Sequence, residues 1–180
     1  PWKGEPMKKT ILKCGLLFRG IDETVEKNMA VTVEDNRIAS VAPWEDGAVP
    51  ADAQVIDLSD KFVTPGLIDA HVHVNMNGEP NTDSLAKMLT GEFALYSMVN
   101  AQKDLMAGFT TIRDEGGVGF SDVALKNAIN SGMVVGPRMF VSGVALSSTG
   151  GHGDASFAPG VTGGTMASIV NSPDEARRAA

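Results

Sequence analysis

The sequence has few cysteines, few histidines and no excess of basic residues, and these shortages exclude several classes of protein. A single cysteine among 180 residues cannot form an internal disulfide, so we expect Cys14 to be a small buried residue of a cytoplasmic protein. The formal net charge is -7 and the lysines and arginines are scattered, so we expect neither nucleic acid nor an anionic membrane as a partner. No apolar run approaches the roughly 20 residues that a membrane-spanning helix needs. The hydrophobic content of 43% is ample for a soluble globular core.

Residues 10 to 64 are short β-type runs separated by polar turns. The runs lie at 11–18, 29–33, 37–42, 53–58 and 61–64, and the polar residues at 34–37 and 58–61 predict a hairpin and a further turn. We therefore expect a small antiparallel β unit in this part of the chain.

After Pro65 strand-like and helical runs alternate, which is typical of βα units around a parallel sheet. Apolar residues at helical spacing predict a long helix packed on the sheet and ended by Gly108, and a shorter helix capped by Ser121. A glycine-rich loop precedes a last helix capped by Ser172. We expect strands at 66–74, 109–114 and 138–143, helices at 84–107 and 121–131, and the loop at 147–165.

Two of the three histidines lie one residue apart in the first of these strands. Because side chains alternate along a strand, Asp69, His71 and His73 are expected to share one face. Two imidazoles aimed at one point can supply half of a tetrahedral shell around a divalent metal. The spacing alone leaves open whether they bind a metal or are ordinary histidines of an edge strand.

The string FVTPGLIDAHVHV at 62–74 resembles the first barrel strand of the metal-dependent amidohydrolase superfamily. The strings AGFTTIRDEGG and GPRMFVSGVALSSTGGHGD are more narrowly similar to its imidazolonepropionase-like and prolidase-type branch. The resemblance implies an α/β fold, a (β/α)8 TIM-type barrel with a small N-terminal β-sandwich domain. It divides the chain into an extension at 1–6, a β-sandwich portion at 7–64 and the incomplete barrel at 65–180.

The resemblance also implies a site for one or two divalent ions, of which zinc is the expected metal, with His71 and His73 as ligands. Asp69 is expected to orient a ligand, and His152, in the loop after the third strand, to bind substrate. A turn held by local ion pairs is the favoured interpretation of residues 113–115. A closed barrel needs about 250 residues, so only three βα units are present, and the other ligands and the general base are expected beyond Ala180 or on a second chain.

The expected function is hydrolysis of C–N (amide or peptide) bonds by a metal-activated water, with a dipeptide or N-acyl amino acid as the small-molecule substrate. A cyclic-amide hydrolase of imidazolone or hydantoin type would use the same visible residues. A non-catalytic fragment that is completed by a second chain is the alternative from another class. We also expect a homo-oligomer.

Overall fold

The computed structural model describes residues 9–78, 88–154 and 167–180. The chain divides into two compact units, one ending at Pro65 and one beginning at Gly66. No helix within the described ranges combines the length and the apolar character needed to cross a membrane.

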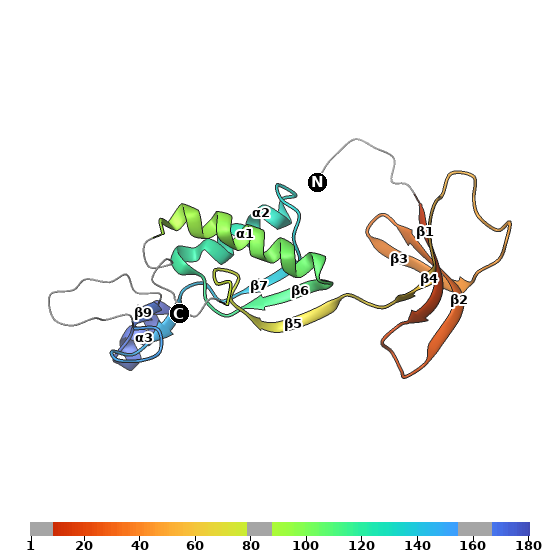
Figure 1. Ribbon diagram of the computed structural model, residues 1–180. Coiled ribbons are helices and arrows are strands. Elements are labelled where there is room, and N and C mark those ends of the chain that lie inside the picture. The colour runs from red at the N-terminus through yellow and green to blue at the C-terminus, as the bar shows by residue number, and fades with distance from the viewer. Residues whose placement is uncertain (1–8, 79–87, 155–166) are drawn as a thin grey trace. The chain divides into compact units, whose positions relative to one another are not determined.

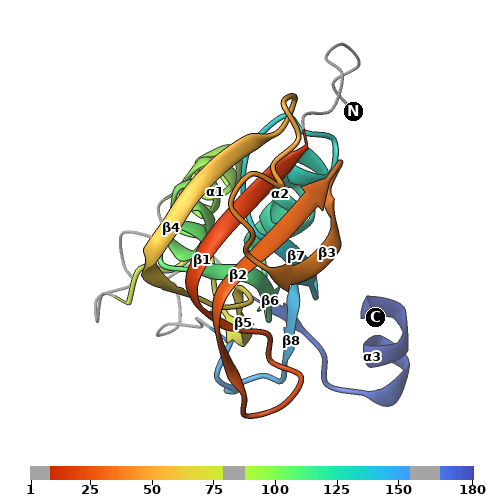
Figure 2. The same cartoon turned by 90° about the vertical axis from the view of Figure 1, so that its right-hand side faces the viewer.

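The first unit is a four-stranded sheet, seen face-on in Figure 2. Its strands are β1 (Thr10–Phe18), β2 (Val25–Glu34), β3 (Arg37–Pro43) and β4 (Gln54–Val63). They lie in the order β3-β2-β1-β4; the first three strands form antiparallel pairs, whereas β4 pairs with β1 in parallel. The prediction of a purely antiparallel unit is therefore wrong, because β4 returns to the sheet by a crossover and not by a hairpin.

Residues 58–61 lie inside β4, where the sequence predicts a turn. The pairing of β1 with β4 shifts register at this point, so that β4 bulges opposite Gly15. A Cβ at Gly15 would overlap the carbonyl of Ser59, and the Asp57 carboxylate accepts a 2.9 Å hydrogen bond from the Ser59 N–H. The turn prediction is wrong because Gly15 leaves room for a polar bulge in a continuous strand.

Two other predictions for this unit are confirmed. Cys14 is free and 1% exposed, and burial raises the pKa of its thiol. The polar residues at 34–37 form the hairpin between β2 and β3, in which Asp35 takes the left-handed conformation with φ of 60°.

The second unit is built on a three-stranded parallel sheet in the order β5-β6-β7, with α1 and α2 on one face (Figure 1). The predicted alternation of parallel strands and helices is confirmed, and the sheet is not closed into a barrel. The elements are β5 (Leu67–Val72), α1 (Thr90–Met106), β6 (Phe109–Asp114), the 3-10 turn η2 (Val118–Phe120), α2 (Ser121–Asn130) and β7 (Arg138–Val141).

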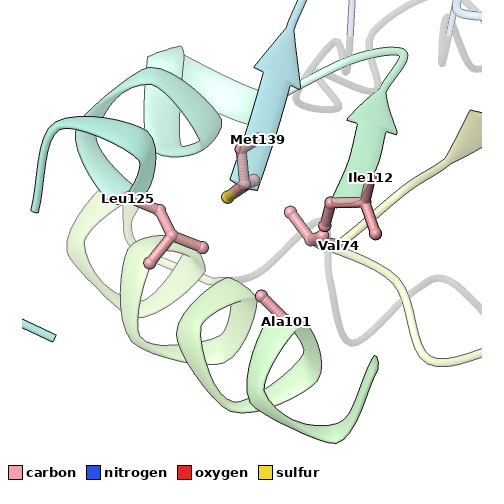
Figure 3. Packing of buried hydrophobic residues seen from close by; sticks show 5 residues of the cluster. All are labelled: Val74, Ala101, Ile112, Leu125 and Met139. Atoms are coloured by element: carbon pink, nitrogen blue, oxygen red, sulfur yellow. The ribbon is translucent and has the colours of Figure 1, made fainter. Parts of the chain in front are cut away.

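The core of this unit lies between the sheet and the two helices. Figure 3 shows Ala101 from α1 and Leu125 from α2 facing Ile112 of β6, which is 0% exposed. Met139 of β7 and Val74, just beyond β5, complete the cluster. The core therefore lies on the helix side of the sheet and leaves the other side available for a site.

The long helix differs from its prediction in length and in its buried face. It begins at Thr90, where the Glu92 carboxylate accepts a 2.6 Å hydrogen bond from the Leu89 N–H. The residues predicted to precede it at 84–87 lie outside the described ranges. Its end at Gly108, where φ is 101°, is confirmed. Val99 and Met106 belong to the apolar residues at helical spacing that were predicted to pack on the sheet, but both are exposed. The buried side chains are Phe93, Ser97, Asn100 and Ala101.

The second helix also begins differently, because Ser121 is its first residue and makes no side-chain cap. The cap position is Phe120, with φ of 61°. The end of α2 at Ser131 is confirmed, and so is the Ser172 cap of α3 (Pro173–Ala179).

The region of the glycine-rich loop contains a pair of strands that the sequence did not predict. They are β8 (Ala145–Ser147) and β9 (Ala167–Ile169), which pair in parallel. Residues 155–166 of the loop lie outside the described ranges.

Candidate metal centre

His71 and His73 come together at the carboxyl end of β5. His71 is the second-last residue of the strand, and His73 directly follows its end at Val72. The two ring centroids are 5.3 Å apart, with the ring planes at 75°. Both residues line a cleft of about 510 Å³, as expected for side chains that share one face.

The ring separation of this pair and the lowered pKa of His73 are compatible with binding of a divalent metal. With zinc about 2.1 Å from each nitrogen and a tetrahedral angle, two imidazoles on one ion would have centroids about 5 Å apart. Burial lowers the pKa of His73, and the neighbouring His71 lowers it further, while Glu115 opposes the shift. A lowered pKa favours the neutral imidazole, which is the form that binds metal.

Asp69 does not share the face of the two histidines, so this expectation is wrong. Asp69 pairs with Ile112, and Val72 pairs with Asp114. An advance of three residues along β5 therefore matches an advance of only two residues along β6. This bulge breaks the side-chain alternation and puts Asp69 level with a residue of the helix-facing core. The carboxylate of Asp69 accepts a 3.0 Å hydrogen bond from the backbone N–H of His71. Asp69 therefore contacts the main chain of His71 and does not line the cleft.

His152 lies on the same cleft as His71 and His73. A charge on His152 would lower the pKa of His73 further. The loop that carries His152 is tied down at Gly153, whose N–H donates to Ser147 Oγ at 3.1 Å, and at Thr149, whose N–H donates to Asn171 Oδ1 at 2.9 Å. The β8 and β9 pair thus forms the base from which His152 reaches the cleft.

Residues 113–115 contain the predicted ion pair and a buried acid that the prediction missed. Arg113 Nε lies 2.6 Å from Glu115 Oε1 and also donates to the carbonyl of Ala70 at 2.8 Å. Asp114 between them is 0% exposed, and its Oδ1 accepts a 3.0 Å hydrogen bond from the Val74 N–H. Burial raises the pKa of Asp114 to about 6. The alternation of side chains along a strand could have identified this buried acid. Asp114 lies two residues after Ile112 and therefore shares its buried face.

A second buried carboxylate, Asp122 at the start of α2, ties together the loops after β6 and β7. It is 0% exposed, and its Oδ2 accepts a 2.9 Å hydrogen bond from the Gly143 N–H. Gly117 donates its own N–H to the Gly143 carbonyl at 2.8 Å. These bonds fix the edge of the cleft beside Gly116.

Two histidines are fewer ligands than a catalytic metal site requires. Over residues 9–78, 88–154 and 167–180 no three His, Cys, Asp or Glu side chains form a group that could hold a metal ion. The described residues therefore do not by themselves make up a complete metal site.

Residues 62–179 match the Amidohydrolase family. The chain belongs to this family. The match includes His71, His73, Asp114 and the loop that carries His152.

Relatives of this amidohydrolase chain are enzymes of greater length. It is 34% identical over 152 residues to the ochratoxinase of Aspergillus niger, covering 82% of this chain and 30% of the relative. The crystal structure of a Xaa-Pro dipeptidase with bound methionine in the active site matches with a TM-score of 0.83 and 29% identity, over 96% of this chain and 43% of that one. A prolidase complexed with N-methylphosphonate-L-proline matches with a TM-score of 0.80 and 33% identity, over 96% of this chain and 43% of that one.

The amidohydrolase chain thus spans less than half the length of each of these three relatives. The predicted family is confirmed, and so is the coarse fold of an N-terminal β-sheet followed by parallel βα units.

Proposed function

We propose that the full-length protein containing this chain is a metal-dependent hydrolase of C–N bonds. In this proposal β5, β6 and β7 are the first three strands of a (β/α)8 barrel, and β1 to β4 belong to its β-sandwich. The observation that carries the proposal is the His71 and His73 pair, with ring centroids 5.3 Å apart at the edge of one cleft.

His71 and His73 would hold a divalent cation, with zinc as the expected metal and one or two ions at the site. Such a cation polarises a carbonyl and lowers the pKa of a coordinated water. The chain itself contributes two imidazoles on a strand end and a cleft wall that includes Glu115 and Asn75. The remaining ligands and the general base are proposed to lie beyond this chain.

His152 is the proposed contact for a carboxylate or carbonyl group of the substrate. It is exposed on the cleft and can donate a hydrogen bond from its ring. A substrate bound between it and the His71 and His73 pair would place a C–N bond beside the metal. This arrangement suits a short molecule with a terminal carboxylate, such as a dipeptide or an N-acyl amino acid.

The relatives support the same substrate class. One is a Xaa-Pro dipeptidase, and the ligand of the prolidase is a proline substituted on nitrogen. Cyclic amides of the imidazolone or hydantoin type belong in the same assay, because they would use the same visible residues.

The test compares three single-histidine variants of the full-length protein. His71→Ala and His73→Ala are expected to lose bound metal, measured by mass spectrometry of the purified protein, and to lose turnover of Xaa-Pro dipeptides and N-acyl amino acids. His152→Ala is the matched control, because it removes the third histidine of the cleft. It is expected to keep the metal and to show a raised KM.

Retention of metal and turnover in both His71→Ala and His73→Ala would overturn the proposal. Metal binding without turnover of any amide would instead favour a non-catalytic role in which a second chain completes the site.

A further inference from the structure

The turn after β5, which begins with His73, is held at Val74 by two buried side chains from different elements. The Val74 N–H donates to Asp114 Oδ1 of β6 at 3.0 Å, and its carbonyl accepts from Asn100 Nδ2 of α1 at 2.9 Å. Asn100 also donates to the Met76 carbonyl at 3.0 Å. Val74 is 2% exposed and packs toward Ala101 (Figure 3), so water cannot replace either partner.

These bonds act on the peptide unit that leaves His73. The Val74 N–H and the His73 carbonyl belong to one planar peptide group. Asp114 holds the N–H end of this group, and the Met76 N–H donates to the His73 carbonyl at 2.9 Å. Because both the N–H and the carbonyl of this peptide group are held, the ψ torsion of His73 is fixed. The direction in which the His73 side chain leaves the main chain is then fixed as well.

A carboxylate is a costly group for this task. Asp114 is 0% exposed, and its second oxygen, Oδ2, has no hydrogen-bond partner among the described residues. Burial opposes its ionised form. The hydrogen bond from the Val74 N–H favours the ionised carboxylate and offsets part of this cost.

We propose that Asp114 and Asn100 are positioning residues for His73, which fix its backbone so that its ring meets the ring of His71 on the cleft. This inference rests on the proposed function, in which His71 and His73 hold a metal. His71 has an analogous backbone contact, since Asp69 accepts its N–H.

Asp122 offers a matched control for Asp114. It too is 0% exposed, accepts one backbone N–H, from Gly143, and has one oxygen without a partner among the described residues. Gly143 follows β7 and adjoins no proposed ligand. Asp122 also raises the pKa of Asp114, but its own hydrogen bond involves neither Val74 nor His73. Loss of Asp122 should therefore disturb the fold about as much as loss of Asp114 and leave the bonds at Val74 in place.

The test measures the metal affinity of the full-length protein with Zn²⁺ and with Co²⁺, whose absorption spectrum reports the ligand geometry. Asp114→Ala is expected to weaken metal binding by about 10- to 100-fold and to change the Co²⁺ spectrum. Asp114→Asn keeps an oxygen that can accept the Val74 N–H and should restore most of the affinity. Asp122→Ala should leave the affinity within about 3-fold of wild type, a change too small for the loss of an orienting contact.

Hydrogen exchange of the Val74 amide in the metal-free protein gives a readout that does not depend on metal. It should accelerate in Asp114→Ala and not in Asp122→Ala. If Asp114→Ala does not fold, Asn100→Ala tests the same turn, and it is also expected to weaken metal binding.

Equal losses of affinity in Asp114→Ala and Asp122→Ala would overturn the inference, as would unchanged affinity in Asp114→Ala when His73→Ala loses the metal. A wild-type protein that binds no divalent metal would overturn the proposed function and the positioning role together.

Discussion

Replacing Gly117 by alanine tests how tightly the two loops beside the cleft are held together. Gly117 has φ of -99° and ψ of 125°, which any residue can adopt, so alanine meets no backbone strain. The obstacle is Asp122, because a Cβ at Gly117 would overlap its carboxyl group and lie 2.7 Å from its Cβ. The carboxylate must then move away from the Gly143 N–H that it now binds at 2.9 Å.

The expected cost follows from three contributions. Loss of a hydrogen bond to a charged acceptor costs about 1.5–3 kcal/mol, and overpacking costs about 1–3 kcal/mol. Replacing glycine lowers the entropy of the unfolded chain and returns about 0.4–1 kcal/mol. Gly117→Ala should therefore destabilise the full-length protein by about 2–5 kcal/mol in urea unfolding. Gly91→Ala, where the new Cβ meets nothing within 4 Å, is the control and should have no destabilising effect.

A double-mutant cycle identifies Asp122 as the cause. In an Asp122→Ala background the two closest atoms are gone and only the 2.7 Å contact with Cβ remains. Gly117→Ala should then cost about 1 kcal/mol, which gives a coupling of at least about 1 kcal/mol. An equal cost in both backgrounds, or a cost below about 0.5 kcal/mol in the wild type, would refute this account of the loop contact.

Two further predictions concern other buried positions. The pKa of Asp114 is raised from 3.8 to about 6, so the folded state binds a proton more tightly than the unfolded chain. The stabilisation that this proton provides is complete below pH 3.8 and is lost as the pH rises through 6, and it amounts to at most about 3 kcal/mol. Urea unfolding at several pH values measures the unfolding free energy of wild type minus that of Asp114→Asn. This difference should fall between pH 4 and 6 and level off above pH 6. A difference that does not change with pH would contradict the prediction. Gly15→Ala should destabilise the β1 and β4 pair by about 2 kcal/mol or more, because its Cβ would meet backbone atoms of Ser59 that cannot rotate away, and an unchanged melting temperature would show that the bulge adapts.

The elements that the sequence predicts correctly are those whose signals are local. The strand at 109–114 and the ends of the helices at Gly108 and Ser131 follow from periodicity and stop residues within a few positions. The Ser172 cap is likewise contained in one helical turn. None of these features needs knowledge of a partner strand.

The errors concern pairing, which depends on residues far apart in the chain. The polar residues at 58–61 have turn composition, and what makes them a bulge is Gly15 on a strand much earlier in the sequence. The bulge after Asp69 is similar, because the alternation rule assumes an unbroken ladder. An aspartate side chain can accept a hydrogen bond from the backbone N–H two residues later, as Asp69 does from His71. An aspartate in the middle of a predicted strand therefore indicates that the strand is irregular at that point.

The candidate site was half predictable for the same reason. His71 and His73 were singled out by their spacing on one strand, and the resemblance to the family implied their roles and that of His152. The structure brings all three to one cleft. Asp114 and Asn100 were not singled out, because their importance comes from burial and from contact with Val74, which no spacing reveals.

Buried polar side chains lie beside His73 because the main chain leaves the sheet there while it is still buried. The Glu115 N–H bonds the Val72 carbonyl at 3.0 Å, where β5 ends. The next buried residue, Val74, has no strand partner for its N–H or its carbonyl, and a buried main chain must find partners among side chains. A chain that leaves a sheet while still buried thus requires groups such as Asp114 and Asn100. Because His73 is joined to Val74 by one rigid peptide, the bonds that satisfy the main chain also fix the direction of the histidine side chain.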